Sequence, residues 1–452
     1  MLRTTKRRAG ALLTRSGILL LLLTLPGLAT AQEKECKLSA SSAASTAADA
    51  LESARTETDS EKVAAEYHKA FDAVNKVVES GTKDPTPYIL AAQAAVGLGE
   101  YEKATDLLNR FVELAPECKE HADNTRYNAW VVLYNAGIGL YQTGDSDGAL
   151  AKFETANDIW PDARSINNAA LLYREKGDTA KAMDLYREVM TLEGNLDQVR
   201  NATASLADLL NAEGRSDEAI QTYQTYVEAH PDDVVARIQY ALVLSDAGQA
   251  KVAEGIFTEV LQRDDLSFEQ WVQVGVGLFR NSNYKAAAEA FSKARADNPF
   301  NKEAMENLVN ARIQAGQAGD AVALGDTLVQ WYPYDAGNYQ LLANALARTN
   351  QNARALKLME QVDEAPISFD AIQMGAAGGD DYMVRGVVSA RKSGAGKALT
   401  IPFEFLGTGG QVVASKELDL QAPADNESTT FQLMVTSAEP ILGFRYGKAK
   451  GS

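Results

Sequence analysis

The sequence predicts a mostly α-helical protein: an α-solenoid of about eight helix-pair repeats with a degenerate pair before them, followed by a small antiparallel β-sandwich. Three observations support this prediction. Small residues recur at a nearly constant spacing through the middle of the chain. Glycine or asparagine turns and prolines recur in step with them. Near Pro366, helical periodicity gives way to alternating apolar and polar residues with glycine-rich turns.

The composition excludes several classes of function. Hydrophobic residues make up 46% and charged residues 23% of the 452 residues, which is ordinary for a folded protein. Lys and Arg number 44 against 61 Asp and Glu, a formal charge of -17; without the first 31 residues, which hold only basic charges, the balance is 39 against 61, or -22. Such an acidic chain repels nucleic acid and anionic membranes, so neither is expected as a partner. Two Cys and three His are too few for a multi-ligand zinc or iron–sulfur centre, and no metal or cofactor is expected.

Residues 1–31 have the three-part layout of a secretory signal peptide. A basic segment without acids precedes an apolar run at 18–28, and Ala29-Thr30-Ala31 offers small residues for cleavage before Gln32. The alternative is a retained membrane anchor, but the run is shorter than the roughly 20 residues of a membrane span. We therefore expect an exported protein of the periplasm or cell surface, with no transmembrane segment after cleavage.

One small residue marks each repeat. Successive members are 45 residues apart at first, then 33 to 37, and the last four gaps are each 34. The set is Ala104, Ala149, Ala182, Ala219, Ala253, Ala287, Ala321 and Ala355. Two antiparallel helices can approach closely where small residues cross, and a bulky residue four positions later fills the space beside them. Because one pair cannot bury its apolar face alone, the units are expected to stack.

Two segments show the repeat most clearly: NAWVVLYNAGIGLYQTGDSDGALAKFETANDIWP and SFEQWVQVGVGLFRNSNYKAAAEAFSKARADNP. The pattern resembles the tetratricopeptide repeat (TPR), a 34-residue helical pair with small residues at the helix crossing and a closing proline. The resemblance covers about residues 85–362 and implies a TPR solenoid over 85–364. A degenerate helical pair, at 40–55 and 61–80, is expected within the tail at 32–84. Gly325 lacks the bulky residue, so its unit is expected to pack more loosely.

The first gap of 45 residues implies an insertion of eleven, at about 117–127, which we expect to enlarge a connecting loop. Cys118 lies in this segment, and Cys36 is the only other thiol. Because the leader implies an oxidising compartment, we predict a Cys36–Cys118 disulfide that ties the N-terminal tail to the loop. The alternative is two unrelated free thiols.

Residues 365–448 are predicted to form the β-sandwich, with strands at 367–369, 382–388, 399–406, 411–420, 430–436 and 441–446. This part resembles FxLYD-type and related immunoglobulin-like modules of exported bacterial proteins. FEFLGTGG stands where those modules carry an aromatic–Leu–Tyr–Asp turn, so the Tyr and Asp are missing. Such a module could cover the apolar end of the last repeat.

The candidate binding residues are polar side chains fourteen positions before the repeat alanines, on inner helices that line the concave face of a solenoid. They are Asn135, Asn168, Ser205, Gln239, Gln273 and Asn307, and the row ends at Leu341. An amide both donates and accepts hydrogen bonds, so a row of amides can bind the backbone of an extended peptide. The row resembles the asparagine ladder of O-linked GlcNAc transferases, which implies the same use; the alternative is that these amides serve helix packing. Neighbouring groove candidates are Asn167, Arg174, Asp208, Asn310, Asn344 and Arg348.

No catalytic motif stands out. The sequence has no G-x-S-x-G, H-E-x-x-H, P-loop or dinucleotide fingerprint, so we predict a non-enzymatic protein. The expected function is a scaffold of the cell envelope that takes a protein or peptide segment in its groove. Two alternatives stay open: an envelope-polymer or carbohydrate binder acting through the β module, and a self-assembling structural subunit.

Overall fold

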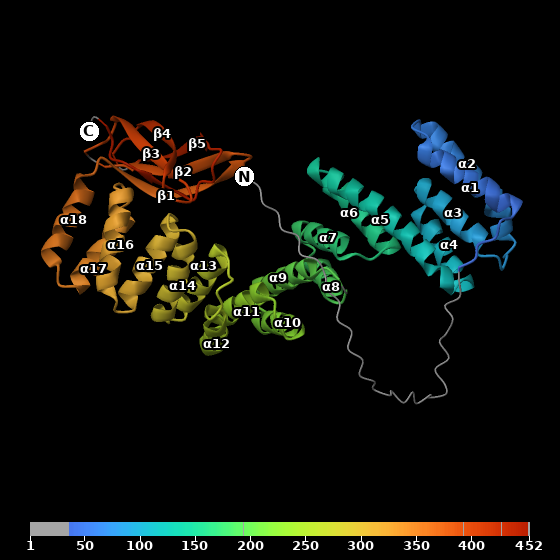
Figure 1. The fold of residues 1–452 in the computed structure, drawn as a ribbon, viewed down its shortest axis with the longest axis horizontal. Coiled ribbons are helices and arrows are strands. Elements are labelled where there is room, and N and C mark those ends of the chain that lie inside the picture. The colour runs from blue at the N-terminus through green and yellow to red at the C-terminus, as the bar shows by residue number, and fades with distance from the viewer. Residues whose placement is uncertain (1–35, 193, 392, 426, 451–452) are drawn as a thin grey trace, which may run out of the picture. The chain divides into compact units, whose positions relative to one another are not determined.

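The computed structural model describes residues 36–450 except 193, 392 and 426. The predicted signal peptide at 1–31 lies outside the described residues. The chain forms two compact units, and the division falls between Pro161 and Asp162. This division lies inside the predicted solenoid, so each unit is described by itself (Figure 1).

The first unit contains three antiparallel helix pairs. The first pair is the predicted degenerate one, and its Ala70 and Val74 are fully buried, as the spacing to Ala104 predicts. No helix in the described residues is long and apolar enough to cross a membrane. The helices of this unit are α1 (Ser42–Thr56), α2 (Ser60–Glu79), α3 (Thr86–Gly97), α4 (Tyr101–Leu114), α5 (Lys119–Gln142) and α6 (Ser146–Ile159).

The expected loop at 117–127 is wrong, because most of this insertion is helical. A short 3-10 turn (Pro116–Cys118) leads directly into α5, which runs for 24 residues. Ala122, Thr125 and Ala129 are buried at spacings of three and four, so the inserted residues add an amphipathic stretch to the helix. The insertion therefore lengthens an inner helix instead of a connection.

The predicted disulfide is present. Cys36 and Cys118 are bonded across a separation of 82 residues, and Cys118 is 1% exposed. The tail is held a second time by the N–H of Ser39, which donates to Oγ1 of Thr86 on α3 at 2.6 Å. In the chain-entropy model, closing a loop of this length restrains the unfolded chain by at most about 4–5 kcal/mol.

The second unit continues with six helix pairs and the β module. The nine pairs of the two units confirm the predicted mostly helical solenoid. The helices of the second unit are α7 (Ala163–Glu175), α8 (Thr179–Met190), α9 (Leu196–Ala212), α10 (Ser216–Ala229), α11 (Val234–Asp246), α12 (Ala250–Leu261), α13 (Phe268–Arg280), α14 (Tyr284–Asp297), α15 (Lys302–Gln314), α16 (Ala318–Trp331), α17 (Ala336–Arg348) and α18 (Asn352–Glu364).

The repeat alanines mark the helix crossings. Seven of the eight, from Ala104 to Ala321, are 0% exposed, whereas Ala355 on the last helix is half-buried. The expected loose packing at Gly325 is not found: Gly325 is buried, and a Cβ built there would lie 3.0 Å from Cδ1 of Leu342. Leu342 of the next helix, α17, occupies the space that a bulky side chain fills in the other repeats.

The β module consists of six antiparallel strands in two three-stranded sheets, ordered β1-β2-β5 and β4-β3-β6. Both sheets contribute aromatic rings to a common core. The ring centroid of Phe369 lies 5.1 Å from that of Phe431 in its own sheet and 6.2 Å from that of Phe403 in the other sheet. The strands are β1 (Ile367–Gly378), β2 (Asp381–Ala390), β3 (Ala398–Leu406), β4 (Val412–Gln421), β5 (Ser428–Thr436) and β6 (Gly443–Tyr446).

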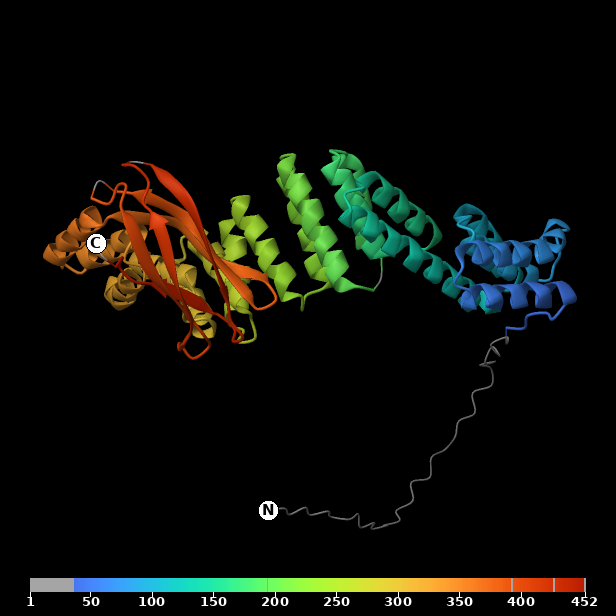
Figure 2. The same ribbon diagram turned by 90° about the horizontal axis from the view of Figure 1, so that it is seen from above.

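The module packs on the turns that join the last repeats, and Figures 1 and 2 show it lying across one end of their helices. The hydroxyl of Tyr332 donates to the carbonyl of Phe444 at 2.7 Å, and the N–H of Phe369 donates to the carbonyl of Tyr334 at 2.8 Å. The module therefore does not cover the apolar end of the last repeat. Leu356 on α18 stays 69% exposed, because the sandwich covers inter-repeat turns instead.

Two glycines of α5 offer a matched test of the close helix crossing. A Cβ on Gly137 would lie 2.6 Å from the ring of Phe153, whereas a Cβ on Gly139 would meet nothing within 4 Å. We expect Gly137→Ala to lower the free energy of unfolding by about 1–3 kcal/mol through overpacking. Gly139→Ala should raise it by up to about 1 kcal/mol, since alanine favours the helix. Urea unfolding followed by circular dichroism checks both, and equal stability of the two variants would contradict the packing described.

Candidate functional site

The predicted amide row lies on the first helix of successive repeats. Asn135 lies on α5 of the first unit and is exposed. In the second unit the row continues on α7, α9, α11, α13 and α15, and all five members are half-buried: Asn168, Ser205, Gln239, Gln273 and Asn307. Leu341 on α17 packs against the hydrophobic core. A half-buried polar side chain is steadied by its neighbours and still reaches solvent, as binding of a peptide backbone requires.

Two members of the row are joined directly. Nε2 of Gln239 donates to Oε1 of Gln273 at 3.4 Å, so residues 34 apart in sequence lie side by side. Asn167, a predicted neighbour of the row, is engaged differently. Its Nδ2 donates to the backbone and side-chain oxygens of Gln198 at 3.1 and 2.9 Å. The amide of Asn167 therefore ties α7 to α9, which is the helix-packing role.

The other predicted neighbours lie nearer to solvent. Asn310 is half-buried, and Arg174, Asp208, Asn344 and Arg348 are exposed. Asn344 accepts a hydrogen bond from Gln340 on its own helix at 3.1 Å. In the described part of the chain, no hydrogen bond joins two of these five residues.

Partly buried ion pairs hold the inner helices in register. Asp233, the N-cap of α11, accepts from the Arg200 guanidinium of α9 and from the Tyr226 hydroxyl, each at 2.8 Å. Lys302 of α15 contacts Asp335, the N-cap of α17, at 2.8 Å. In both pairs the cation contacts the N-cap aspartate that lies 33 residues further along the chain, so the same type of ion pair joins inner helices at two places in the solenoid. The pairs fix the spacing of the helices that carry the amide row.

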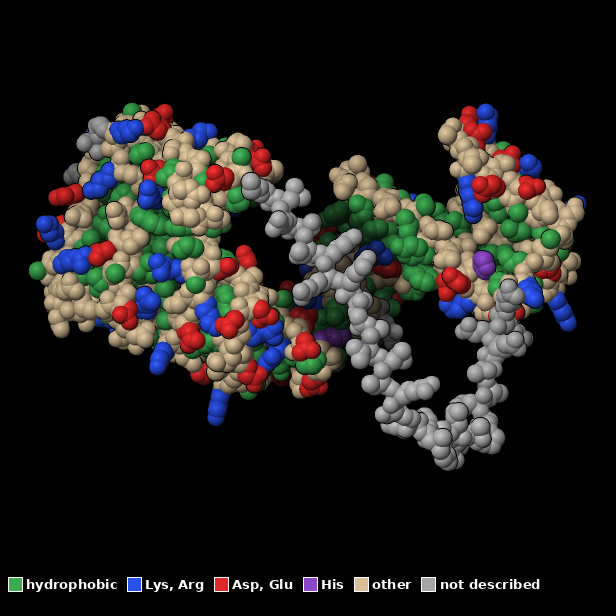
Figure 3. Space-filling view, in the orientation of Figure 1, with side chains coloured by type: hydrophobic (Ala, Val, Ile, Leu, Met, Phe, Trp, Pro, Cys, Tyr) green, Lys and Arg blue, Asp and Glu red, His purple; other side chains and the backbone are tan. Residues whose placement is uncertain are grey.

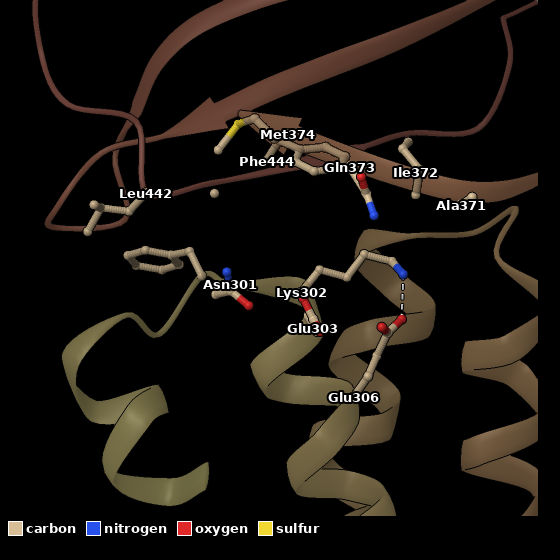
Figure 4. A pocket seen from close by; sticks show the side chains of 12 residues that line it. Asn301, Lys302, Glu303, Glu306, Ala371, Ile372, Gln373, Met374, Leu442 and Phe444 are labelled. Carbon is tan, nitrogen blue, oxygen red and sulfur yellow. Dashed lines mark hydrogen bonds and ion pairs between the residues drawn. The ribbon is translucent and has the colours of Figure 1, made fainter. Parts of the chain in front are cut away.

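A pocket of about 460 Å³ lies where the inner face of α15 meets the β module, as Figure 4 shows. The floor is the start of α15, with Lys302 and Glu306. The opposite wall is β1, with Ile372 and Met374, and the segment before β6 closes one side. Sequence reasoning missed this pocket, because no repeat spacing relates the β module to α15.

The charges at the pocket floor balance one another. Burial alone would lower the pKa of Lys302, but Glu306 and Asp335 hold the pKa of this ammonium above its ordinary value. Burial raises the pKa of Glu306, and the neighbouring Lys302 charge opposes that rise. Lys302 is therefore committed to its two carboxylates and is not available as a cation for a ligand.

Two further carboxylates extend this surface along the groove. Glu303 lines both the 460 Å³ pocket and an adjoining hollow of about 280 Å³, which Glu269 and Gln273 also line. Both glutamates are exposed, and within the described residues neither has an ion-pair partner. They lie four residues before Gln273 and Asn307, on the same helix face, and 34 residues apart. That spacing is the sequence signal that could have identified them.

The described residues offer no metal-binding cluster: they hold no group of three or more His, Cys, Asp and Glu side chains suited to an ion. Elsewhere on the second unit, acidic and basic side chains are interspersed over the face seen in Figure 3. The chemistry that this site can perform is hydrogen bonding and charge pairing along an elongated surface.

Comparison with known families agrees with the repeat geometry. Family models of the tetratricopeptide repeat match residues 134–192, 200–243 and 275–336. The helix pairs within these segments are tetratricopeptide repeats. The matched TPR segments include α7, α15 and most of α9, and with them Asn135, Asn168, Ser205, Gln239 and Asn307 of the row. No curated protein sequence matches the chain.

Several solved structures are similar to parts of this chain. A tetratricopeptide repeat protein from Parabacteroides merdae is 17% identical, covers 52% of this chain and 92% of its own, and has a TM-score of 0.35. The pilF protein of Pseudomonas aeruginosa is 17% identical, with coverages of 48% and 98% and a TM-score of 0.36. Yeast Tom70 is 13% identical, with coverages of 71% and 88% and a TM-score of 0.32. Similarity at this level does not indicate a partner.

The cap of α11 makes stability depend on pH. Burial would raise the pKa of Asp233, but the Ala236 N–H, the Arg200 guanidinium and the Tyr226 hydroxyl together hold that pKa below its ordinary value. The unfolded chain therefore binds a proton more readily. The stabilisation is complete above the unfolded pKa of about 3.9 and is lost as pH falls through the folded pKa.

We therefore expect Asp233→Asn to cost about 1–2 kcal/mol at pH 7 and much less at pH 3. Urea unfolding at the two pH values measures the difference from the natural chain. Asp232→Asn is the matched control, since Asp232 is exposed and adjacent. An Asp233→Asn effect of the same size at both pH values, or an equal effect of Asp232→Asn, would contradict this account.

Proposed function

We propose that this protein is a non-enzymatic scaffold of the cell envelope that binds an extended segment of a protein partner on the inner face of its TPR solenoid. TPR folds are typical of protein-interaction scaffolds, and the family models that match segments of the chain are tetratricopeptide repeats. The observation that carries the proposal is the half-buried polar row on five consecutive inner helices. Its members Gln239 and Gln273 lie at equivalent positions of successive repeats, and their side chains are joined by a hydrogen bond.

The envelope location rests on two independent features. Residues 1–31 have the layout of a secretory leader. Cys36 and Cys118 form a disulfide, and such bonds persist in oxidising compartments outside the cytosol. Both features favour export to the periplasm or the cell surface.

The alternatives have less support. A carbohydrate-binding module would present aromatic faces, but the Phe and Tyr side chains of the described residues 366–450 are buried, except for the half-buried Tyr382. Self-assembly would use an uncovered surface, and exposed Leu356 on α18 is the feature that favours it. We propose a structural role for the β module, because it packs on the inter-repeat turns.

Affinity capture tests the proposed function. The mature chain, residues 32–452, would be used to capture proteins from an envelope extract of its own organism, beside the variant Asn168→Ala/Gln239→Ala/Asn307→Ala. We expect at least one protein that recurs with the natural chain and is lost with the variant, because three backbone-binding side chains are removed.

The matched control removes polar side chains from outer helices, in Gln221→Ala/Gln224→Ala/Gln361→Ala. It should retain the partner, and helicity by circular dichroism should be unchanged in both variants. A partner captured equally by both variants would show that the amide row serves helix packing alone.

A further inference from the structure

The inner face and the β module share one elongated groove. The 280 Å³ hollow on α13 and α15 shares Asn301 and Glu303 with the 460 Å³ pocket. That pocket shares Gln373 and Met374 with a third hollow of about 180 Å³ along β1. The three hollows therefore adjoin one another, from the amide row at Gln273 to the edge of a β-sheet.

The wall of this groove is an edge strand whose outer side faces the solenoid. β1 is paired only with β2 in its sheet, and the N–H of Phe369 points outward, where it donates to Tyr334. Backbone groups alternate between the two sides of an antiparallel strand. A bulge at Ala371, whose φ is +50°, shifts the pairing so that Gln373 faces Arg385 of β2. Beyond the bulge, the backbone N–H and C=O groups of Met374 and Ala376 therefore point away from β2, toward the open edge of the sheet.

Edge strands in natural proteins are usually protected against further pairing by charge, proline, a bulge or a covering element. On β1 the pairing with β2 is shifted twice, at the bulge and again between Ala376 and Gly378. Between the two shifts the edge reads Gln-Met-Gly-Ala, without charge or proline, and of these four residues only Met374 is half-buried. Small side chains also leave room for a second strand to approach. Such an edge beside a pocket is suited to strand addition.

The charge along the groove selects the occupant. Glu269 and Glu303 line the 280 Å³ hollow at the α13 and α15 end, and both are exposed and without an ion-pair partner among the described residues. Lys302, the cation that lines the adjoining 460 Å³ pocket, is held by Glu306 and Asp335. Arg385 lies at the opposite end, in the hollow along β1. A segment with basic residues over α13 and α15 complements this distribution.

We propose that an extended, Lys- or Arg-bearing segment of the partner adds as a strand to the outer edge of β1 at Met374 and Ala376, while its basic side chains pair with Glu269 and Glu303. This inference rests on the proposed function, because it names the partner class for the same inner face. Backbone hydrogen bonds to the strand provide affinity, and the two carboxylates provide selection by charge.

A defined peptide tests the proposal on the full mature chain. The probe is a fluorescein-labelled eight-residue peptide of alternating Lys and Thr, with an alternating Glu and Thr peptide for comparison. Fluorescence anisotropy should show binding of the Lys peptide, weakening with salt, and at least tenfold weaker binding of the Glu peptide. Equal binding of the two peptides, or no binding of the Lys peptide, would overturn the proposal.

Two pairs of variants locate the peptide. Ala376→Pro removes an outward N–H and leaves the β1–β2 pairing in place, so we expect about three- to tenfold weaker binding. Its control is Ser415→Pro, at an outward position of the edge strand β4. Glu269→Gln/Glu303→Gln should weaken binding and flatten its salt dependence, and the control is Glu289→Gln/Glu360→Gln on outer helices.

The outcomes separate this inference from the proposed function. Weakening by Ala376→Pro and by the Glu269→Gln/Glu303→Gln pair, with both controls unchanged, supports strand addition at β1. If only the triple amide variant weakens binding, the inner face binds peptide and the proposal about β1 is overturned. If Ser415→Pro weakens binding as much as Ala376→Pro, the effect comes from the fold of the module, and the proposal is likewise overturned.

Discussion

The structure depends on the close approach of paired helices at one small residue in every repeat. Seven repeat alanines are fully buried, and bulky rings such as Phe153 of α6 pack against small residues of the facing helix such as Gly137 of α5. Side chains at such crossings decide how near two helices can lie. Because the crossing recurs at the same place in each repeat, the pairs within each of the two compact units stack in a similar way. The 34-residue spacing in the sequence thus becomes a constant spacing of inner helices.

The function that we propose follows from that constant spacing. It brings polar residues 34 apart into contact, as at Gln239 and Gln273, and it places Glu269 and Glu303 at equivalent positions. The N-caps Asp233 and Asp335 are tied to the preceding inner helix by Arg200 and Lys302. These partly buried pairs cost desolvation, yet they fix the register of the surface that a partner would contact. The β module adds a strand edge where the groove ends.

Much of this architecture could be predicted from local sequence patterns. The repeat period located the helix pairs, the leader and two thiols pointed to the disulfide, and alternation located the strands. Tertiary context decided the rest. The segment 117–127 became helix because Ala122 and Thr125 could be buried against neighbours, and Gly325 packs tightly because Leu342 reaches across from the next helix. The pocket between α15 and β1 joins elements of unrelated period, so no spacing in the sequence indicates it.

Hydrogen–deuterium exchange of the full mature chain, with and without a partner captured through the amide row, tests the central claim most directly. The account predicts slower exchange on binding at 268–276, 302–310 and 372–378, which are the inner helices and the free edge of β1. The outer helices α14 and α16 should exchange as before, since they line none of the three hollows. Protection confined to outer helices or to α18 would contradict the claim that the inner face and β1 form the binding site.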